Sequence, residues 1–113
     1  METCTLASRS CVPCKGGIPP LQSDELSRLY SELGNGWQLI ENRRLEKLFK
    51  FKDFAGALAF TNRVGALAEQ QGHHPDIELS WGKVTLRIWT HKIGGLTESD
   101  FILAAKSDTV EKA

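Results

Sequence analysis

The stretch VTLRIWTH, residues 84–91, alternates between aliphatic side chains and polar or aromatic ones. Successive side chains of a strand point to opposite sides of a sheet, so this pattern predicts a strand with one buried face. The buried face is expected to hold Val84, Leu86 and Ile88. The opposite face then holds Thr85, Arg87, Trp89 and His91, which places His91 at the end of the strand and away from the core.

Other strands are expected upstream of this one. IELSW, residues 77–81, puts Ile77, Leu79 and Trp81 on one face, and Gly82-Lys83 makes a turn between the two strands. Further upstream, WQLIEN (residues 37–42) and LEKLFKF (residues 45–51) predict a second hairpin that turns at Asn42-Arg43. The sequence therefore predicts four strands in two hairpins.

Three helices are expected around these hairpins. Ser23 is the predicted N-cap of the first helix and Asp53 that of the second, which Gly72 ends as a left-handed cap. Thr97 caps the third helix, with Asp100 in the capping-box position. The apolar stripe of the second helix is expected to contain Phe54, Ala57, Leu58, Thr61, Val64 and Ala68.

The order of these elements predicts an α+β fold. Residues 21–113 should form a single-domain two-layer sandwich, α-β-β-α-β-β-α, with a four-stranded, mostly antiparallel sheet and three helices on one face. One sheet face then lacks a helical cover, and Trp89 is a candidate for it. We therefore expect a homo-oligomer that forms through the sheet or its edge.

Composition excludes several classes of function. The chain has 113 residues, enough for one domain with one modest core. Its 14 basic and 14 acidic residues give zero formal net charge, so electrostatics favours no nucleic-acid partner. No apolar run is long enough to cross a membrane. The N-terminal sequence METCTLASRSC lacks the apolar core of a signal peptide, so a cytoplasmic location is expected.

Residues 1–20 are interpreted as an N-terminal arm that carries Cys4, Cys11 and Cys14. Cys11 and Cys14 form a C-x-x-C motif, which is typical of zinc or redox sites. A structural zinc normally has four protein ligands, and the chain has no second C-x-x-C motif. The simplest interpretation is reduced thiols in an arm, and the sequence assigns them no role.

The stretch EQQGHHPD, residues 69–76, is the clearest candidate for a functional site. It places two adjacent histidines, His73 and His74, between the end of a helix and the start of a strand. Pro75 disfavours helical backbone at His74, so the pair sits on a rigid corner. Histidine titrates near neutral pH and is both a common proton donor or acceptor and a common metal ligand.

Three hypotheses account for His73, His74 and the third histidine, His91. They are unrelated residues, or three ligands of a zinc ion with an open position for water, or acid–base catalysts. Adjacent side chains in extended backbone point apart, which suits one metal ion poorly. In the acid–base hypothesis, Glu69 or Asp100 would orient an imidazole and stabilise its charged form.

The segments EQQGHHPDI and THKIGGLTESD, with FKFKDFAGALAFTNRV upstream, resemble the pterin-4a-carbinolamine dehydratase family over roughly residues 21–108. The resemblance implies a lyase that needs no cofactor and no metal. Its substrate would be a 4a-hydroxytetrahydropterin, dehydrated to quinonoid dihydropterin during tetrahydropterin recycling. The family also suggests a tetramer built from dimers.

The resemblance also implies a role for each motif residue. His73 and His91 match acid–base catalysts, and His74 matches a residue that mainly holds the pterin. Glu69, Pro75, Asp76, Ile77 and Asp100 match positions that bind the substrate or support the site. Animal members carry tryptophan where this chain has Ile77, so one wall of the pocket is expected to differ. They also resemble a dimerisation partner of a homeodomain transcription factor, which leaves a protein-binding module as an alternative to the dehydratase and to a three-histidine hydrolase.

Overall fold

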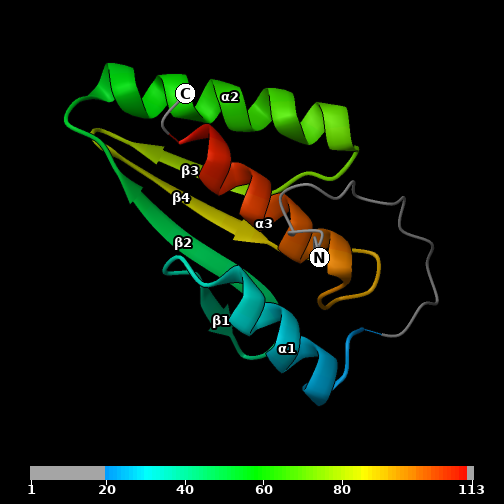
Figure 1. Ribbon diagram of the computed structural model, residues 1–113. Helices are drawn as coiled ribbons and strands as arrows, with labels where there is room; N and C mark the ends of the chain where they lie inside the picture. The colour runs from blue at the N-terminus through cyan, green and yellow to red at the C-terminus, as the bar shows by residue number, and fades with distance from the viewer. Residues whose placement is uncertain (1–19, 112–113) are drawn as a thin grey trace, which may run out of the picture.

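The computed structural model describes residues 20–111, which form three helices and four strands (Figure 1). In chain order these are α1 (Ser23–Leu33), β1 (Gln38–Ile40), β2 (Arg44–Lys50), α2 (Phe54–Gln71), β3 (Asp76–Ser80), β4 (Lys83–Ile88) and α3 (Glu98–Val110). The predicted α-β-β-α-β-β-α order is confirmed. Residues 1–19, with the CVPC motif, lie outside the described part, so the N-terminal arm stays a prediction.

The four strands form one sheet in the order β1-β2-β4-β3, and every neighbouring pair is antiparallel. The register pairs Leu45 with Ile88 and Phe49 with Val84, so aliphatic and aromatic side chains of the two central strands share one face. All four of these side chains are buried. The alternation that predicted the strands thus also fixes which face meets the helices.

All three helices lie on the same face of the sheet, and α3 lies between α1 and α2 and contacts both (Figure 1). The layer between helices and sheet is the core. Its central aromatic contact joins Phe49 of β2 and Phe60 of α2, whose ring centroids are 4.6 Å apart. The two-layer α+β prediction is therefore confirmed.

Two details of the helix predictions are wrong. Helix α1 begins at Ser23, and Gln22 occupies the N-cap position without a side-chain hydrogen bond. In α2, Phe54 and Leu58 are exposed, while Phe60 is fully buried. The sheet is covered by Ala57, Phe60, Val64 and Ala68, whose three- and four-residue spacing follows one side of a helix.

The sheet face opposite the helices carries charged side chains at its centre. Arg87 of β4 donates hydrogen bonds to Glu78 of β3 and Glu46 of β2, and these carboxylates raise the pKa of Arg87, Glu78 most of all. Trp81 was expected to share a strand face with Ile77, but it follows β3 in a turn and is 70% exposed. The turn frees its side chain from the sheet. Oligomerisation through this face stays a prediction.

Candidate active site

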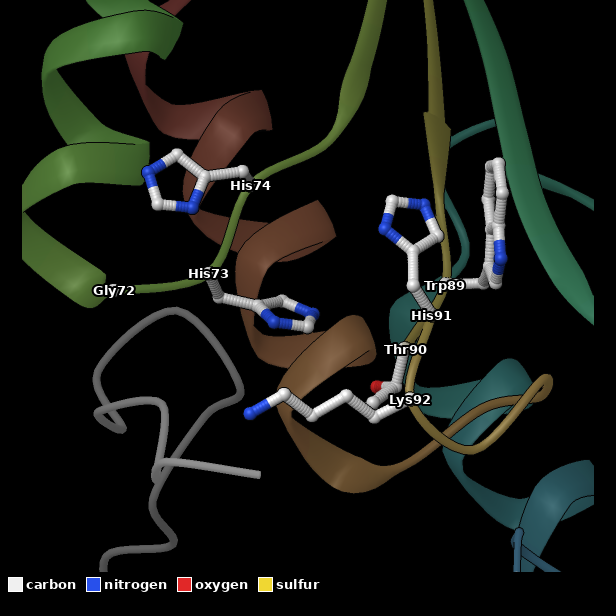
Figure 2. Close-up of a pocket in the computed structure, with 7 residues that line it drawn as sticks. All are labelled: Gly72, His73, His74, Trp89, Thr90, His91 and Lys92. Carbon is white, nitrogen blue, oxygen red and sulfur yellow. The ribbon is translucent and has the colours of Figure 1, made fainter. Parts of the chain in front are cut away.

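A surface hollow of about 330 Å³ brings the three histidines together (Figure 2). It lies between the α2–β3 corner and the segment that follows β4. In Figure 2, His73 and His74 come from the corner, and His91 faces them from the other side. The residues that line the hollow are Gly72, His73, His74, Trp89, Thr90, His91 and Lys92.

Gly72 sets the direction in which the chain leaves α2. Its backbone angles, φ 66° and ψ 27°, are left-handed, as predicted for a helix-ending glycine. The backbone N–H groups of Gly72 and His73 both donate to the carbonyl of Ala68. The first histidine is therefore held by main-chain hydrogen bonds at the end of the helix, which limits how far its side chain can move.

His73 is bonded to a buried carboxylate. Its Nε2 lies 2.6 Å from Oδ1 of Asp100, a side chain with no exposed surface. The other oxygen of Asp100 accepts hydrogen bonds of 2.8 Å from the Thr90 hydroxyl and from the backbone N–H of Thr97. The predicted capping box of α3 is confirmed, and the same carboxylate reaches the histidine hollow. In a neutral His73 the proton then sits on Nε2 and leaves Nδ1 as the acceptor.

His74 has a different kind of partner. Its Nε2 lies 2.5 Å from Oε2 of Glu69, one turn back on α2. The side chains of His74 and Glu69 are 58% and 78% exposed. Solvent screens such a pair, so it adds little to stability, but it biases the direction of the ring.

His91 is held by packing. Its ring lies edge-on to Trp89, with centroids 4.3 Å apart and planes at 78°. Its Nε2 is 3.9 Å from Oδ1 of Asp76, too far for a hydrogen bond. Strand β4 ends at Ile88, three residues earlier than predicted, because the chain turns there and Thr90 pairs with Gly95 in an isolated bridge.

The remaining predicted site residues lie beside the hollow. Pro75 links His74 to β3, and Asp76 begins that strand. Ile77 pairs with Leu86, so its side chain points to the helical side of the sheet. Its predicted role as a pocket wall stays a prediction.

Sequence reasoning did not assign Trp89, Thr90 or Lys92 to the site. The signal for Trp89 was present, because the alternation in residues 84–91 put it on the same face as His91. Thr90 and Lys92 flank His91, and no motif or periodicity in the sequence singled them out as site residues. The part of Thr90 in the site follows only from the fold, which places Asp100 of α3 within hydrogen-bond distance of its hydroxyl.

The described residues also bear on metals and membranes. Across residues 20–111, no three His, Cys, Asp or Glu side chains are grouped so that they could hold a metal ion. The three histidines share one hollow but do not form a ligand set. None of the three helices in this range is both long and apolar enough to span a bilayer.

A family model described as Pterin 4 alpha carbinolamine dehydratase matches residues 19–110. The chain belongs to the pterin-4a-carbinolamine dehydratase family. The predicted resemblance is therefore confirmed, and the match covers all but the last of the described residues, including both segments that carry the histidines.

Relatives from several bacteria extend this match. A "Putative pterin-4-alpha-carbinolamine dehydratase" of Rickettsia bellii is 53% identical, and the alignment covers 96% of each chain. A protein of the same description from Alkaliphilus metalliredigens is 55% identical over 91% of this chain and 93% of its own. At this identity, the family assignment extends over nearly all of the chain.

The chain is similar to several solved structures, among them the following two. One, described as a transcriptional coactivator/pterin dehydratase from Brucella melitensis, has a TM-score of 0.74 and 32% identity, and covers 80% of this chain and 97% of its own. The other, a pterin dehydratase-like protein described as a RuBisCO assembly factor in the alpha-carboxysome, has a TM-score of 0.60 and 24% identity, and covers 72% and 95%. The second similarity concerns the fold alone.

Proposed function

We propose that the protein dehydrates 4a-hydroxytetrahydropterin to quinonoid dihydropterin and water by histidine acid–base catalysis. One observation carries this proposal: three imidazoles from two distant segments line a single hollow, and His73 is bonded to a buried carboxylate. The reaction breaks the C4a–O bond, adds a proton to the departing hydroxyl and removes a proton from a ring nitrogen. It needs one acid and one base and no redox partner.

His73 is the proposed base. The bond from Nε2 to Asp100 leaves Nδ1 to accept the proton of the ring nitrogen. The imidazolium that results is stabilised by the adjacent carboxylate, which is already fixed by Thr90 and Thr97 and need not reorganise. A positioned base of this kind contributes about 100- to 10,000-fold to a rate.

His91 is the proposed acid. It faces the two other histidines across the hollow, and within residues 20–111 no hydrogen bond occupies its Nε2, since Asp76 is 3.9 Å away. Hydroxide is a poor leaving group, so a proton delivered as the C4a–O bond breaks lowers the barrier. The side chain of His91 is 56% exposed, so exchange with water can restore its proton after each turnover.

His74 and Trp89 are proposed to hold the pterin. The imidazole of His74 is directed by Glu69 and can hydrogen bond to the polar edge of the ring. The indole of Trp89 offers an apolar surface on the opposite wall. Pterins are flat and combine polar edges with aromatic faces, which matches these two kinds of contact.

The proposed place of the reaction is tetrahydropterin recycling. A hydroxylase that consumes tetrahydropterin releases the carbinolamine, and a reductase returns the quinonoid product to the tetrahydro form. The dehydratase would act between the two, in line with its family. The substrate also loses water on its own, so the enzyme must only outpace that reaction.

The decisive experiment is a stopped-flow measurement of carbinolamine loss, with the uncatalysed rate subtracted. We expect His73→Ala and His91→Ala each to lower kcat about 100-fold or more. Arg28→Gln is the control, because Arg28 lies on α1, where it pairs with Glu25 and Glu32 on the exposed surface. Near-normal turnover by a folded His73→Ala or His91→Ala protein would reject the proposed mechanism.

A protein-binding role is the alternative. The similar Brucella melitensis structure is described as a coactivator as well as a dehydratase. In this chain Phe54 and Leu58 lie one turn apart on α2 and are 43% and 40% exposed, an apolar pair that a protein partner could cover. If the wild type shows no catalysed dehydration, and Leu58→Glu abolishes self-association or partner binding, the binding role replaces the enzymatic one.

A further inference from the structure

A second, smaller hollow of about 170 Å³ adjoins the histidine hollow. Trp89 lines both, so each of the two spaces borders this residue. The other lining residues come from the β1–β2 turn, from the first residue of β2 and from the loop between β4 and α3. They are Glu41, Arg43, Arg44 and Gly94.

The β1–β2 turn fixes the shape of this hollow. Glu41 and Asn42 have φ values of 52° and 57°, and the N–H of Arg43 donates to the carbonyl of Ile40 at 2.9 Å. Two successive left-handed residues closed by this bond are typical of a tight hairpin turn whose twist matches the strands. The turn therefore holds Arg43 in a defined place at the rim of the sheet, and strand pairing with Ile40 holds Arg44 beside it.

Both arginines lack an anionic partner among residues 20–111. The guanidinium of Arg44 lies 5.6 Å from the centroid of Trp89, a cation–π contact, and has no carboxylate bonded to it. By contrast, Arg28, Arg63 and Arg87 all donate to protein oxygens. Glu41 supplies one negative charge against two positive ones, so the hollow has a net positive charge.

We propose that this hollow, which we call the arginine subsite, binds an oxyanion on the substituent of the pterin ring. The inference rests on the proposed function for the identity of the ring. A ring in the histidine hollow can direct a substituent past Trp89 toward Arg44. A guanidinium presents a planar fork that matches a carboxylate or phosphate, and stacking on Trp89 keeps the fork in place. The preferred substrate class is then a pterin with an anionic side chain.

The test compares binding of 6-hydroxymethylpterin and its monophosphate, which differ only in the phosphate, by isothermal titration at low salt. We expect wild type to bind the monophosphate about 3- to 10-fold more tightly than the neutral pterin. The expected preference is small because Arg43 is exposed and Arg44 is half-buried, so solvent and salt screen both charges. Pterin-6-carboxylate, as a third probe, separates a carboxylate-specific from a phosphate-specific subsite. Arg44→Gln should remove the preference, and Arg28→Gln should retain it.

Glu41→Gln provides a test in the opposite direction. Removal of its negative charge should raise the preference for the anionic probes, whereas Arg44→Gln lowers it. Equal affinity of wild type for the neutral and both anionic pterins, or ratios unchanged in both variants, would overturn the proposal. Binding is measured without turnover, so a failed dehydration assay beside a retained charge preference would reject the proposed function and keep the arginine subsite.

Discussion

His73 Nε2 and Asp100 Oδ1 lie 2.6 Å apart, although 27 residues separate them in the chain. The histidine stands at the C-terminal end of α2, and the aspartate lies in the first turn of α3. One buried carboxylate thus serves both the capping box of a helix and the orientation of a histidine. The family match and this geometry together make Asp100 the first position to test.

Asp100→Asn should lower kcat about 10- to 100-fold and change KM by less than about threefold. The amide keeps the size of the carboxylate but cannot stabilise a charged His73. It also presents a donor to Nε2, which shifts the neutral ring toward the Nδ1–H tautomer. Tautomer populations from ¹⁵N NMR of His73 therefore provide a readout that a loss of stability alone would not change. Asp24→Asn, in the exposed first turn of α1, is the control, and an unaltered tautomer in Asp100→Asn would contradict this role.

His74→Gln should mainly weaken binding. The ring of His74 lines the hollow, and its one hydrogen-bond partner among the described residues is the exposed Glu69. It therefore suits a substrate contact better than a proton transfer. We expect KM to rise about 3- to 10-fold and kcat to stay within about threefold, in steady-state assays of carbinolamine loss. Glu69→Gln should change KM by less than about twofold. A fall in kcat as large as that of His73→Ala would instead make His74 a catalyst.

Much of the fold could be predicted because its local signals agree. Strict alternation in residues 84–91 fixed the central strand and its buried face, and Asp53, Gly72 and Thr97 marked helix ends by capping chemistry. The buried face of α2 could not be predicted with the same accuracy. Phe54, Leu58 and Phe60 are all large and apolar, and only the sheet decides which of them it covers.

The site was partly predictable for the same reason. The order His-His-Pro predicted a rigid corner between a helix and a strand, and the family resemblance singled out His91. The role of Thr90 depends on a contact across the fold, the hydrogen bond from its hydroxyl, just after β4, to Asp100 in the first turn of α3. Such contacts leave no periodic trace in a sequence. The arginine subsite arises in the same way, from a turn and a loop that are distant in the chain.

Asp108→Ala should destabilise the fold by about 2 kcal/mol, measured by urea unfolding. Asp108 bonds to Lys47 Nζ at 2.7 Å and Trp37 Nε1 at 3.0 Å, and the ion pair is only 16% and 13% exposed. Its removal deprives the Lys47 ammonium and the Trp37 indole N–H of their carboxylate partner between α3 and the sheet. The partial exposure keeps the expected loss below that of a fully buried pair.

Glu25→Ala is the matched control for this ion pair. Glu25 pairs with Arg28 at 3.5 Å on the surface of α1, where both side chains are more than half exposed. Solvent screening limits such a pair to less than about 0.5 kcal/mol. If Glu25→Ala and Asp108→Ala lowered the free energy of unfolding by similar amounts, burial would not be what determines how much an ion pair contributes to stability.

Gly72→Ala and Gly65→Ala should change stability in opposite directions. Both glycines have open space where a Cβ would be added, so neither change causes a clash. Gly72 has φ 66°, which an alanine adopts at a cost of about 1 kcal/mol, whereas Gly65 lies within α2, where alanine gains about 0.5–1 kcal/mol. Thermal unfolding should show a lower Tm for Gly72→Ala and a higher one for Gly65→Ala. Only Gly72→Ala should also lower kcat, because it moves the backbone that holds His73. A rise in Tm for both variants would mean that Gly72 is not needed for its left-handed conformation, and would contradict the proposed role of this cap in positioning His73.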